Sequence, residues 1–164
     1  MKQETNIGLK KEELENSRKI LDGVLANEIV LDMKVRNYHW NVKALNFIGL
    51  HEFFEMIYDK NAERIDEIAE RIRFLWAEVE WNYKHFLEVA TLDEEHETWL
   101  SKETMVKNLL ADKEKHIRIL REAIEEIDEN SDEDMGTEDF LTAIIQVHEK
   151  EAWMLRSMVE DIES

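Results

Sequence analysis

The scarcity of helix-breaking residues constrains this chain more than any other feature of its sequence. Its 164 residues include no proline and only four glycines. Proline lacks a backbone N–H and glycine raises the entropic cost of a helix, so their scarcity favours long uninterrupted helices. The length suits one domain with its own core. We therefore expect an all-α fold, with a short tail over residues 1–8 and a single domain over residues 9–164.

Four stretches repeat apolar residues at the spacing of an amphipathic helix, and they are residues 10–42, 50–79, 101–127 and 140–162. Ser101 is a candidate N-cap for the third stretch. Tyr83, Phe86 and Leu87 predict a short extra helix in the longer connection between the second and third stretches. Residues 128–139 are strongly acidic and are expected to form a loop. Four amphipathic helices of similar length predict a four-helix bundle.

Net charge and composition argue against several classes of function. The formal net charge is −18, which disfavours a nucleic-acid partner because DNA binding requires a basic surface that neutralises phosphates. The chain has no cysteine, which removes disulfides, thiolate metal sites and cysteine nucleophiles and is compatible with a reducing cytoplasm. No apolar run approaches the roughly 20 residues of a membrane span. We expect a soluble cytoplasmic protein without a membrane partner.

Residues 37–73 carry side chains of the kinds that bind metals. His39 and His51 lie on either side of a short break between two helical patterns, and Glu55 follows His51 by one turn. Asp66 and Glu70 form a second pair further along. Residues four apart share one face of a helix, so each pair can act as a two-pronged ligand set. Imidazole with carboxylate suits iron, zinc or manganese, although a run of carboxylates on a helix is also typical of a solvated face.

Spacing limits how these ligands can be combined. His51 and Asp66 are fifteen positions apart, which amounts to about 22 Å along one helix. Metal–ligand bonds are only about 2 Å long, so one helix cannot bring both pairs to a single ion. Either the pairs bind different metals, or a second copy of the helix runs antiparallel across a twofold axis. The long apolar stripes and five tryptophans exceed what one bundle core needs, which favours subunit contacts.

Two stretches of the chain resemble the Dps family of mini-ferritins: NYHWNVKALNFIGLHEFFEMIYDKNAERIDEIAERI and GTEDFLTAIIQVHEKEAWMLRSMVE. The resemblance extends over about residues 10–162. It implies a ferritin-like four-helix bundle that assembles into a homo-dodecamer, a hollow shell of twelve subunits.

The resemblance also implies a role for each ligand candidate. His39 and His51 match the two histidine ligands that one subunit supplies, while Asp66 and Glu70 match the carboxylates of its twofold partner. Glu55 stands where the family typically has Asp, so its carboxylate is displaced by one methylene. The implied centre is therefore an inter-subunit ferroxidase site formed by these five residues.

The implied activity is that of an iron-storing ferroxidase. Such proteins oxidise Fe(II), typically with hydrogen peroxide, and mineralise Fe(III) inside the shell, which protects against oxidative damage. Trp40, beside His39, matches a tryptophan that takes up oxidising equivalents, and simple packing at the helix end is the alternative reading. Two other functions stay open: a DNA-compacting protein, although this chain lacks a lysine-rich tail, and a helical scaffold without catalysis.

The acidic stretch at residues 128–139 corresponds in the family to the region around a threefold pore. Its candidate pore residues are Asp128, Asp132, Asp134 and Asp139, and Asp139 matches a pore-lining aspartate. A ring of carboxylates would attract an entering divalent cation. A solvated turn is the alternative.

An iron centre inside one bundle is not expected. Larger ferritins and related di-iron bundles use Glu-x-x-His pairs. None of the six histidines here has a glutamate three residues before it. His148 falls on or beside an apolar stripe and is expected to be a core or interface histidine rather than a ligand.

Overall fold

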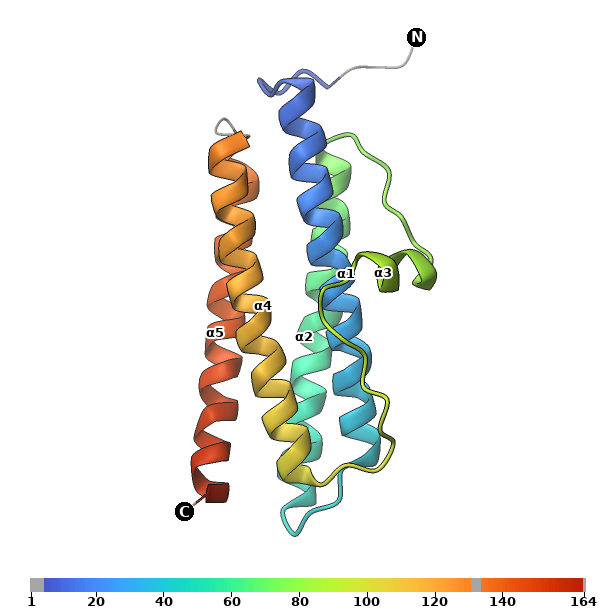
Figure 1. Cartoon of the computed structure of the whole chain (residues 1–164), viewed down its shortest axis with the longest axis vertical. Coiled ribbons are helices and arrows are strands. Elements are labelled where there is room, and N and C mark those ends of the chain that lie inside the picture. The colour runs from blue at the N-terminus through green and yellow to red at the C-terminus, as the bar shows by residue number, and fades with distance from the viewer. Residues whose placement is uncertain (1–4, 131–133, 164) are drawn as a thin grey trace.

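Four long helices and one short helix make up the part of the chain that the computed structural model describes, residues 5–130 and 134–163, which contains no strand. The long helices are α1 (Lys11–Asn41), α2 (Phe47–Phe74), α4 (Lys102–Asn130) and α5 (Met135–Glu163). The short helix α3 (Tyr83–Val89) lies in the connection between α2 and α4 (Figure 1). This arrangement confirms the predicted four-helix bundle with an extra helix.

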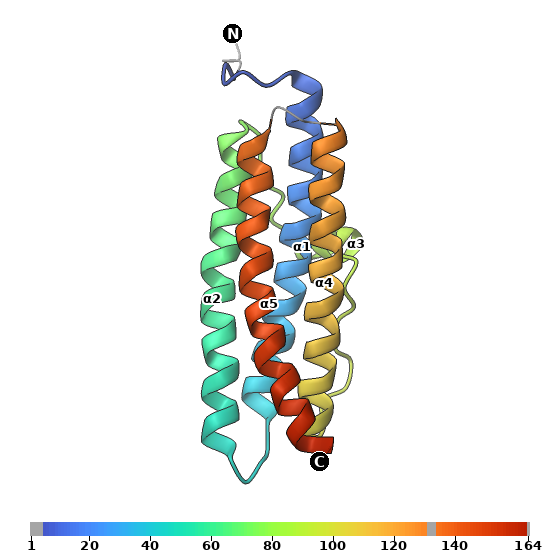
Figure 2. The ribbon, with the colours of Figure 1, turned by 90° about the vertical axis from the view of Figure 1, so that its left-hand side faces the viewer.

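The long helices pair in two antiparallel hairpins. α1 packs against α2, and α4 packs against α5, as Figures 1 and 2 show from two directions. The connection from α2 to α4 runs the length of the bundle and presses α3 against α1. Among the described residues, no helix combines the length and apolar character that crossing a bilayer requires.

Two apolar clusters fill the bundle at different heights. The cluster nearer the start of α1 contains buried residues from every long helix, among them Leu21, Ile68, Leu120 and Leu141. The other cluster does so too, and includes Leu31, Phe54, Leu109 and Leu155. Between the two clusters, every long helix turns a buried polar or charged side chain inward. A polar layer therefore divides the apolar core.

Helix α2 ends five residues before the predicted boundary at residue 79, at Phe74. Trp76 has a φ of 61°, in the left-handed region, and this turn ends the helix. Leu75 and Val79 still pack against the core although they lie beyond the helix. The apolar spacing therefore continued past the true end, and the predicted boundary was wrong.

The predicted acidic loop at residues 128–139 is also mostly helical. Helix α4 continues to Asn130 and α5 already begins at Met135. Asp132, one of the candidate pore residues, lies outside the described residues. Glu138 in the first turn of α5 interacts favourably with the helix dipole, whereas α4 extends to Asn130 although carboxylates are unfavourable near a helix C-terminus.

Asp134 explains why α5 begins where it does. Its Oδ1 accepts a hydrogen bond from the backbone N–H of Thr137 at 3.1 Å, and its Oδ2 accepts one from the Thr137 hydroxyl at 2.7 Å. This is an N-cap geometry. Arg71 of α2 donates to Asp134 Oδ1 at 2.9 Å, so the cap also ties α5 to α2. A Cβ at Gly136 would lie 2.8 Å from the Arg71 guanidinium, so glycine permits this approach.

Candidate metal centre

His39 and His51 come together at one end of the α1–α2 hairpin. His39 lies in the last turn of α1 and His51 lies in the first turns of α2, joined by the short connection at residues 42–46. Their rings stack with centroids 3.7 Å apart and an interplanar angle of 20°. The structure therefore pairs the two histidines that the sequence analysis selected.

Reciprocal hydrogen bonds fix the orientation of both rings. Nδ1 of His39 lies 2.9 Å from the carbonyl oxygen of His51, and Nδ1 of His51 lies 3.0 Å from the carbonyl oxygen of His39. A carbonyl oxygen can only accept, so each Nδ1 carries the proton and donates it. In the neutral rings Nε2 then keeps its lone pair. Such second contacts are what orient metal-binding histidines.

Two aromatic side chains support the pair. Phe47 stacks on His51 with centroids 4.9 Å apart, and Tyr58 packs its edge on His39 at 5.1 Å. The Tyr58 hydroxyl donates to Glu55 Oε1 at 3.4 Å, and the carboxylate of Glu55 is exposed. Tyr58 was not among the predicted site residues, although its position seven residues after His51 places both on one face of α2.

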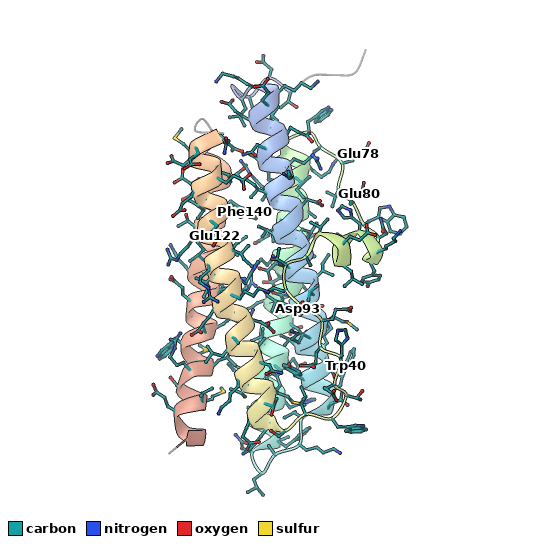
Figure 3. The ribbon with its side chains drawn as sticks, in the orientation of Figure 1. Trp40, Glu78, Glu80, Asp93, Glu122 and Phe140 are labelled. Carbon is teal, nitrogen blue, oxygen red and sulfur yellow. The ribbon has the colours of Figure 1, made fainter. Side chains whose placement is uncertain are left out.

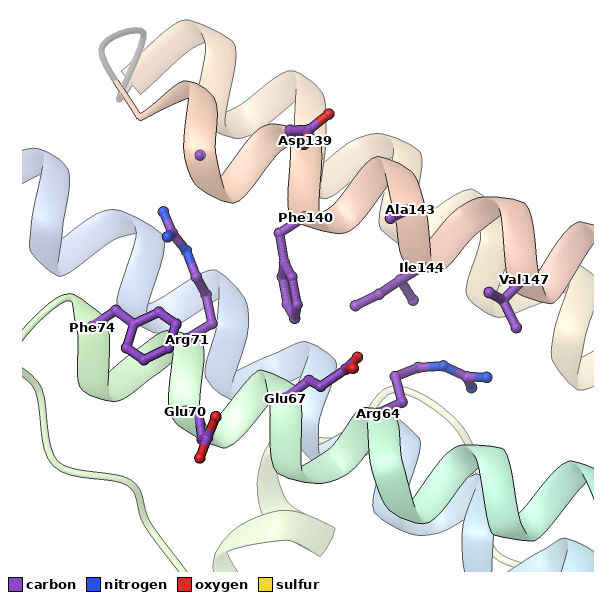
Figure 4. A pocket seen from close by; sticks show the side chains of 11 residues that line it. Arg64, Glu67, Glu70, Arg71, Phe74, Asp139, Phe140, Ala143, Ile144 and Val147 are labelled. Atoms are coloured by element: carbon purple, nitrogen blue, oxygen red, sulfur yellow. The ribbon is translucent and has the colours of Figure 1, made fainter.

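Asp66 and Glu70 lie elsewhere on α2 and are exposed. Glu70 lines an open cleft of about 530 Å³ between α2 and α5 (Figure 4). His51 and Asp66 are fifteen positions apart on this one helix, so the carboxylate pair stays about 22 Å away from the histidine pair within a chain. Within one subunit, the histidine pair and the carboxylate pair therefore cannot bind the same ion.

Trp40 follows His39 in α1, but its side chain points to the surface whereas that of His39 is buried. The Trp40 side chain is 61% exposed, and it lines a groove of about 460 Å³ with Met33, Tyr83 and Leu87. In Figure 3 it projects from the lower part of α1. Its role as an electron donor stays a prediction.

The candidate pore residues separate into different environments. Asp128 is exposed in the last turn of α4, and Asp139 is exposed in the first turns of α5, where it lines the same cleft as Glu70. Asp134 is only 2% exposed and its carboxylate is used by the helix cap and Arg71. Asp139 is thus the better pore candidate.

A second group of ligand-type side chains lies inside the bundle, and the sequence analysis missed it. Glu28, His116 and His148 are fully buried, and each offers a ligand atom within 4.8 Å of the others. Among the described residues, this is the one group of three whose ligand atoms converge in this way. Its burial confirms that His148 is a core histidine.

The buried group has strongly perturbed protonation. Burial lowers the pKa of His148 to about 3. Burial also opposes ionisation of Glu28, but hydrogen bonds from both imidazoles and the charge of Arg64 outweigh it, so the pKa of Glu28 falls well below its ordinary value. For Glu151 burial is likewise outweighed, chiefly by Lys113, and its pKa is lowered. Both carboxylates are therefore ionised at neutral pH.

Comparison with known proteins places this geometry in context. A family model described as a ferritin-like domain matches residues 18–164. A low temperature-induced protein of Nostoc is 41% identical over 157 residues, which cover 94% of this chain and 86% of that protein. DNA protection during starvation protein 2 of Bacillus anthracis is 38% identical over 140 residues, which cover 85% of this chain and 94% of that protein.

Solved structures agree with these sequence matches. The Dps protein of Vibrio cholerae O1, described as a member of the ferritin-like diiron-carboxylate superfamily, superposes with a TM-score of 0.86 at 30% identity and covers 95% of this chain and 96% of its own. The Dps protein of Bacillus brevis has a TM-score of 0.85 at 32% identity, with 92% and 99% coverage.

Proposed function

The chain belongs to the Dps family of ferritin-like proteins, and we propose that it oxidises Fe(II) at sites shared between two subunits and stores the Fe(III) product. One observation carries the proposal: a preorganised histidine pair lies where α1 meets α2, and a carboxylate pair lies further along α2, too far away to bind the same ion. A twofold axis that runs a second α2 antiparallel to the first would bring His39 and His51 of one subunit to Asp66 and Glu70 of its partner. Two equivalent sites per dimer result.

Each ligand has a chemical role at such a site. The imidazoles offer Nε2, and the carboxylates stabilise the more highly charged Fe(III) product by electrostatic attraction. Glu55, which lies within reach of Tyr58 on the histidine side, supplies a further carboxylate. The net charge of −18 favours a cation as substrate over a nucleic acid.

With hydrogen peroxide as the oxidant the electrons balance over two iron ions. Each of two Fe(II) ions gives one electron, the O–O bond of peroxide breaks, and two protons complete two molecules of water. Two irons bound together thus avoid the one-electron cleavage that releases hydroxyl radical. The Fe(III) then mineralises within the shell.

The proposal is tested with a double variant, His51→Ala/Asp66→Ala, which removes one ligand from each half-site. Peroxide-driven Fe(II) oxidation, followed by absorbance, should fall to nearly the rate seen without protein, while light scattering shows an unchanged assembly. Glu63→Ala, an exposed acid on the same helix, is the matched control and should keep the wild-type rate. A wild-type rate in the double variant would show that iron is oxidised elsewhere.

A further inference from the structure

The polar layer at the centre of the bundle has the ligand set of a metal site. Glu28 of α1, His116 of α4 and His148 of α5 converge from three helices, with one carboxylate and two imidazoles. Two histidines with one carboxylate form a set that binds transition metals such as Fe(II). All three side chains have no exposed surface. The apolar clusters above and below close the layer from both sides.

Two protein cations already lie within this set. Arg64 Nη1 is 3.1 Å from Glu28 Oε2 and 3.2 Å from His148 Nε2, so a guanidinium nitrogen sits between two of the ligand groups. Lys113 Nζ is 2.7 Å from Glu151 Oε2 and 3.2 Å from His148 Nδ1. Glu28 and Glu151 are ionised, so their two negative charges face the two positive charges of Arg64 and Lys113.

The hydrogen bonds also determine where the imidazole protons lie. The Lys113 ammonium can only donate, so Nδ1 of His148 must accept and its proton lies on Nε2. That Nε2–H donates to Glu28 Oε1 at 2.6 Å, and His116 Nε2–H donates to the same oxygen at 3.1 Å. The two ring nitrogens that point at the carboxylate are therefore protonated and cannot bind a metal in this state.

The spacing of the buried polar residues along the helices also resembles that of a metal site. Three helices each turn a pair of residues three apart into the layer: Asn61 with Arg64, Lys113 with His116, and His148 with Glu151. Di-iron bundles place Glu-x-x-His pairs at the same spacing. In this chain the pair on α2 contains the cation Arg64, and the pair on α4 contains the cation Lys113.

We propose that the bundle centre is a metal-type ligand set whose cation is supplied by the protein, with Arg64 and Lys113 standing in for a divalent metal ion. Removing both cations would leave two uncompensated carboxylates, a charge that one divalent ion balances. Each bundle thus contains a ligand set that binds a divalent transition metal once Arg64 and Lys113 are replaced by uncharged residues. The proposal is independent of iron oxidation between subunits.

The test uses Co(II), whose visible absorption reports the ligands around it, in the full chain carrying His51→Ala/Asp66→Ala so that the interface half-sites are disabled. Adding Arg64→Met/Lys113→Met removes both charges and leaves unbranched apolar side chains in their place. We expect one Co(II) per subunit with affinity increased by about 100-fold or more, because like charges repel strongly in a low-dielectric interior. His148→Gln in the same background should abolish this binding.

Each other outcome contradicts the proposal. Tight binding of one Co(II) per subunit before Arg64 and Lys113 are changed, lost on His148→Gln, would mean that a metal already displaces the protein cations. Absence of binding after the change, or binding that survives His148→Gln, would mean that the layer is not a ligand set. If the charge-neutral variant does not fold alone, Co(II) should restore its helical circular dichroism, and failure to do so overturns the proposal.

Discussion

At the scale of the residue, the histidines at the hairpin end are defined by the ring nitrogen that each leaves free. Backbone carbonyls hold both Nδ1 atoms, at 2.9 Å and 3.0 Å, and direct the rings into a stack. The sequence could predict that His39 and His51 lie near each other, because a short break separates their helices. It could not predict the reciprocal contacts, which depend on how the connection at residues 42–46 folds.

Glu55 provides a prediction at this scale. Glu55→Gln keeps the side-chain length and the contact with Tyr58 but removes the charge, so Fe(II) oxidation should slow by at least about tenfold, the lower end of what altered outer-shell partners cause at metal sites. Glu55→Asp keeps the charge and should retain most of the activity. Stopped-flow oxidation kinetics compare the two. Equal rates for Glu55→Gln and wild type would remove Glu55 from the site.

The buried imidazole of His148 predicts a pH dependence of stability. Its pKa is lowered from 6.5 to about 3 by burial, so between these values the unfolded chain binds a proton that the folded chain does not. Stability should therefore decrease as pH falls below about 6.5, by up to about 1.4 kcal/mol per pH unit from this one group.

Urea midpoints at equal subunit concentration measure this dependence between pH 5 and about 6.5, where unfolded carboxylates are still largely ionised. In His148→Gln the midpoint should be lower overall but should change less over this range. A variant whose midpoint falls with acid as steeply as that of the wild type would contradict the assignment.

At the scale of the element, the helices that the sequence predicted well are those with local end signals. Ser101 accepts a hydrogen bond from the Thr104 N–H at 3.1 Å, as its N-cap assignment requires. The end of α2 was missed because Trp76 turns left-handed while apolar residues continue beyond it. The start of α5 was missed because the Asp134 cap was read as part of an acidic loop.

The polar layer could not be found from apolar periodicity alone. Glu28 occupies a stripe position, three residues after Leu25 and three before Leu31. In a chain with 39 acidic residues, a glutamate at such a position is predicted to interrupt the apolar stripe and to be exposed, not to be a buried charge. Its burial depends on Arg64, 36 residues away, and on His148, 120 residues away. Only the packed helices bring these partners together.

The first turns of α5 carry the prediction for iron entry. Asp139 is exposed there, and if three copies surround a threefold pore, its charge should speed the capture of Fe(II) in a salt-sensitive way, because the Debye length is about 8 Å at physiological salt. Asp139→Asn should slow iron uptake and weaken its salt dependence without changing assembly.

Glu160→Gln, an exposed acid at the other end of α5, is the control and should change neither. Asp134 is a poor second target because its carboxylate caps the helix. If uptake by Asp139→Asn keeps the wild-type rate and salt dependence, iron enters by another route.

At the scale of the whole molecule, much aromatic surface remains uncovered in one subunit. Trp81, Tyr83 and Trp99 are 83%, 76% and 73% exposed. Surfaces of this kind usually mark contacts between proteins. We expect a closed shell of twelve subunits, and light scattering at micromolar concentration should report a particle near twelve times 19.6 kDa. A stable monomer or isolated dimer would contradict both the shell and iron storage within it.

The central claim is that one site takes its histidines from one subunit and its carboxylates from the partner. Subunits carrying only His51→Ala and subunits carrying only Asp66→Ala each disable every site in their own shells. When both are produced together in equal amounts, a site is intact where an Asp66→Ala subunit supplies its histidines and a His51→Ala subunit supplies its carboxylates.

Fe(II) oxidation by these mixed shells is the most direct measurement. Random pairing across the twofold axis predicts about one quarter of the wild-type rate per subunit, although either variant alone is nearly inactive. Different affinity tags on the two subunits confirm that they share shells. Mixed shells as inactive as the single variants would contradict a site divided between subunits.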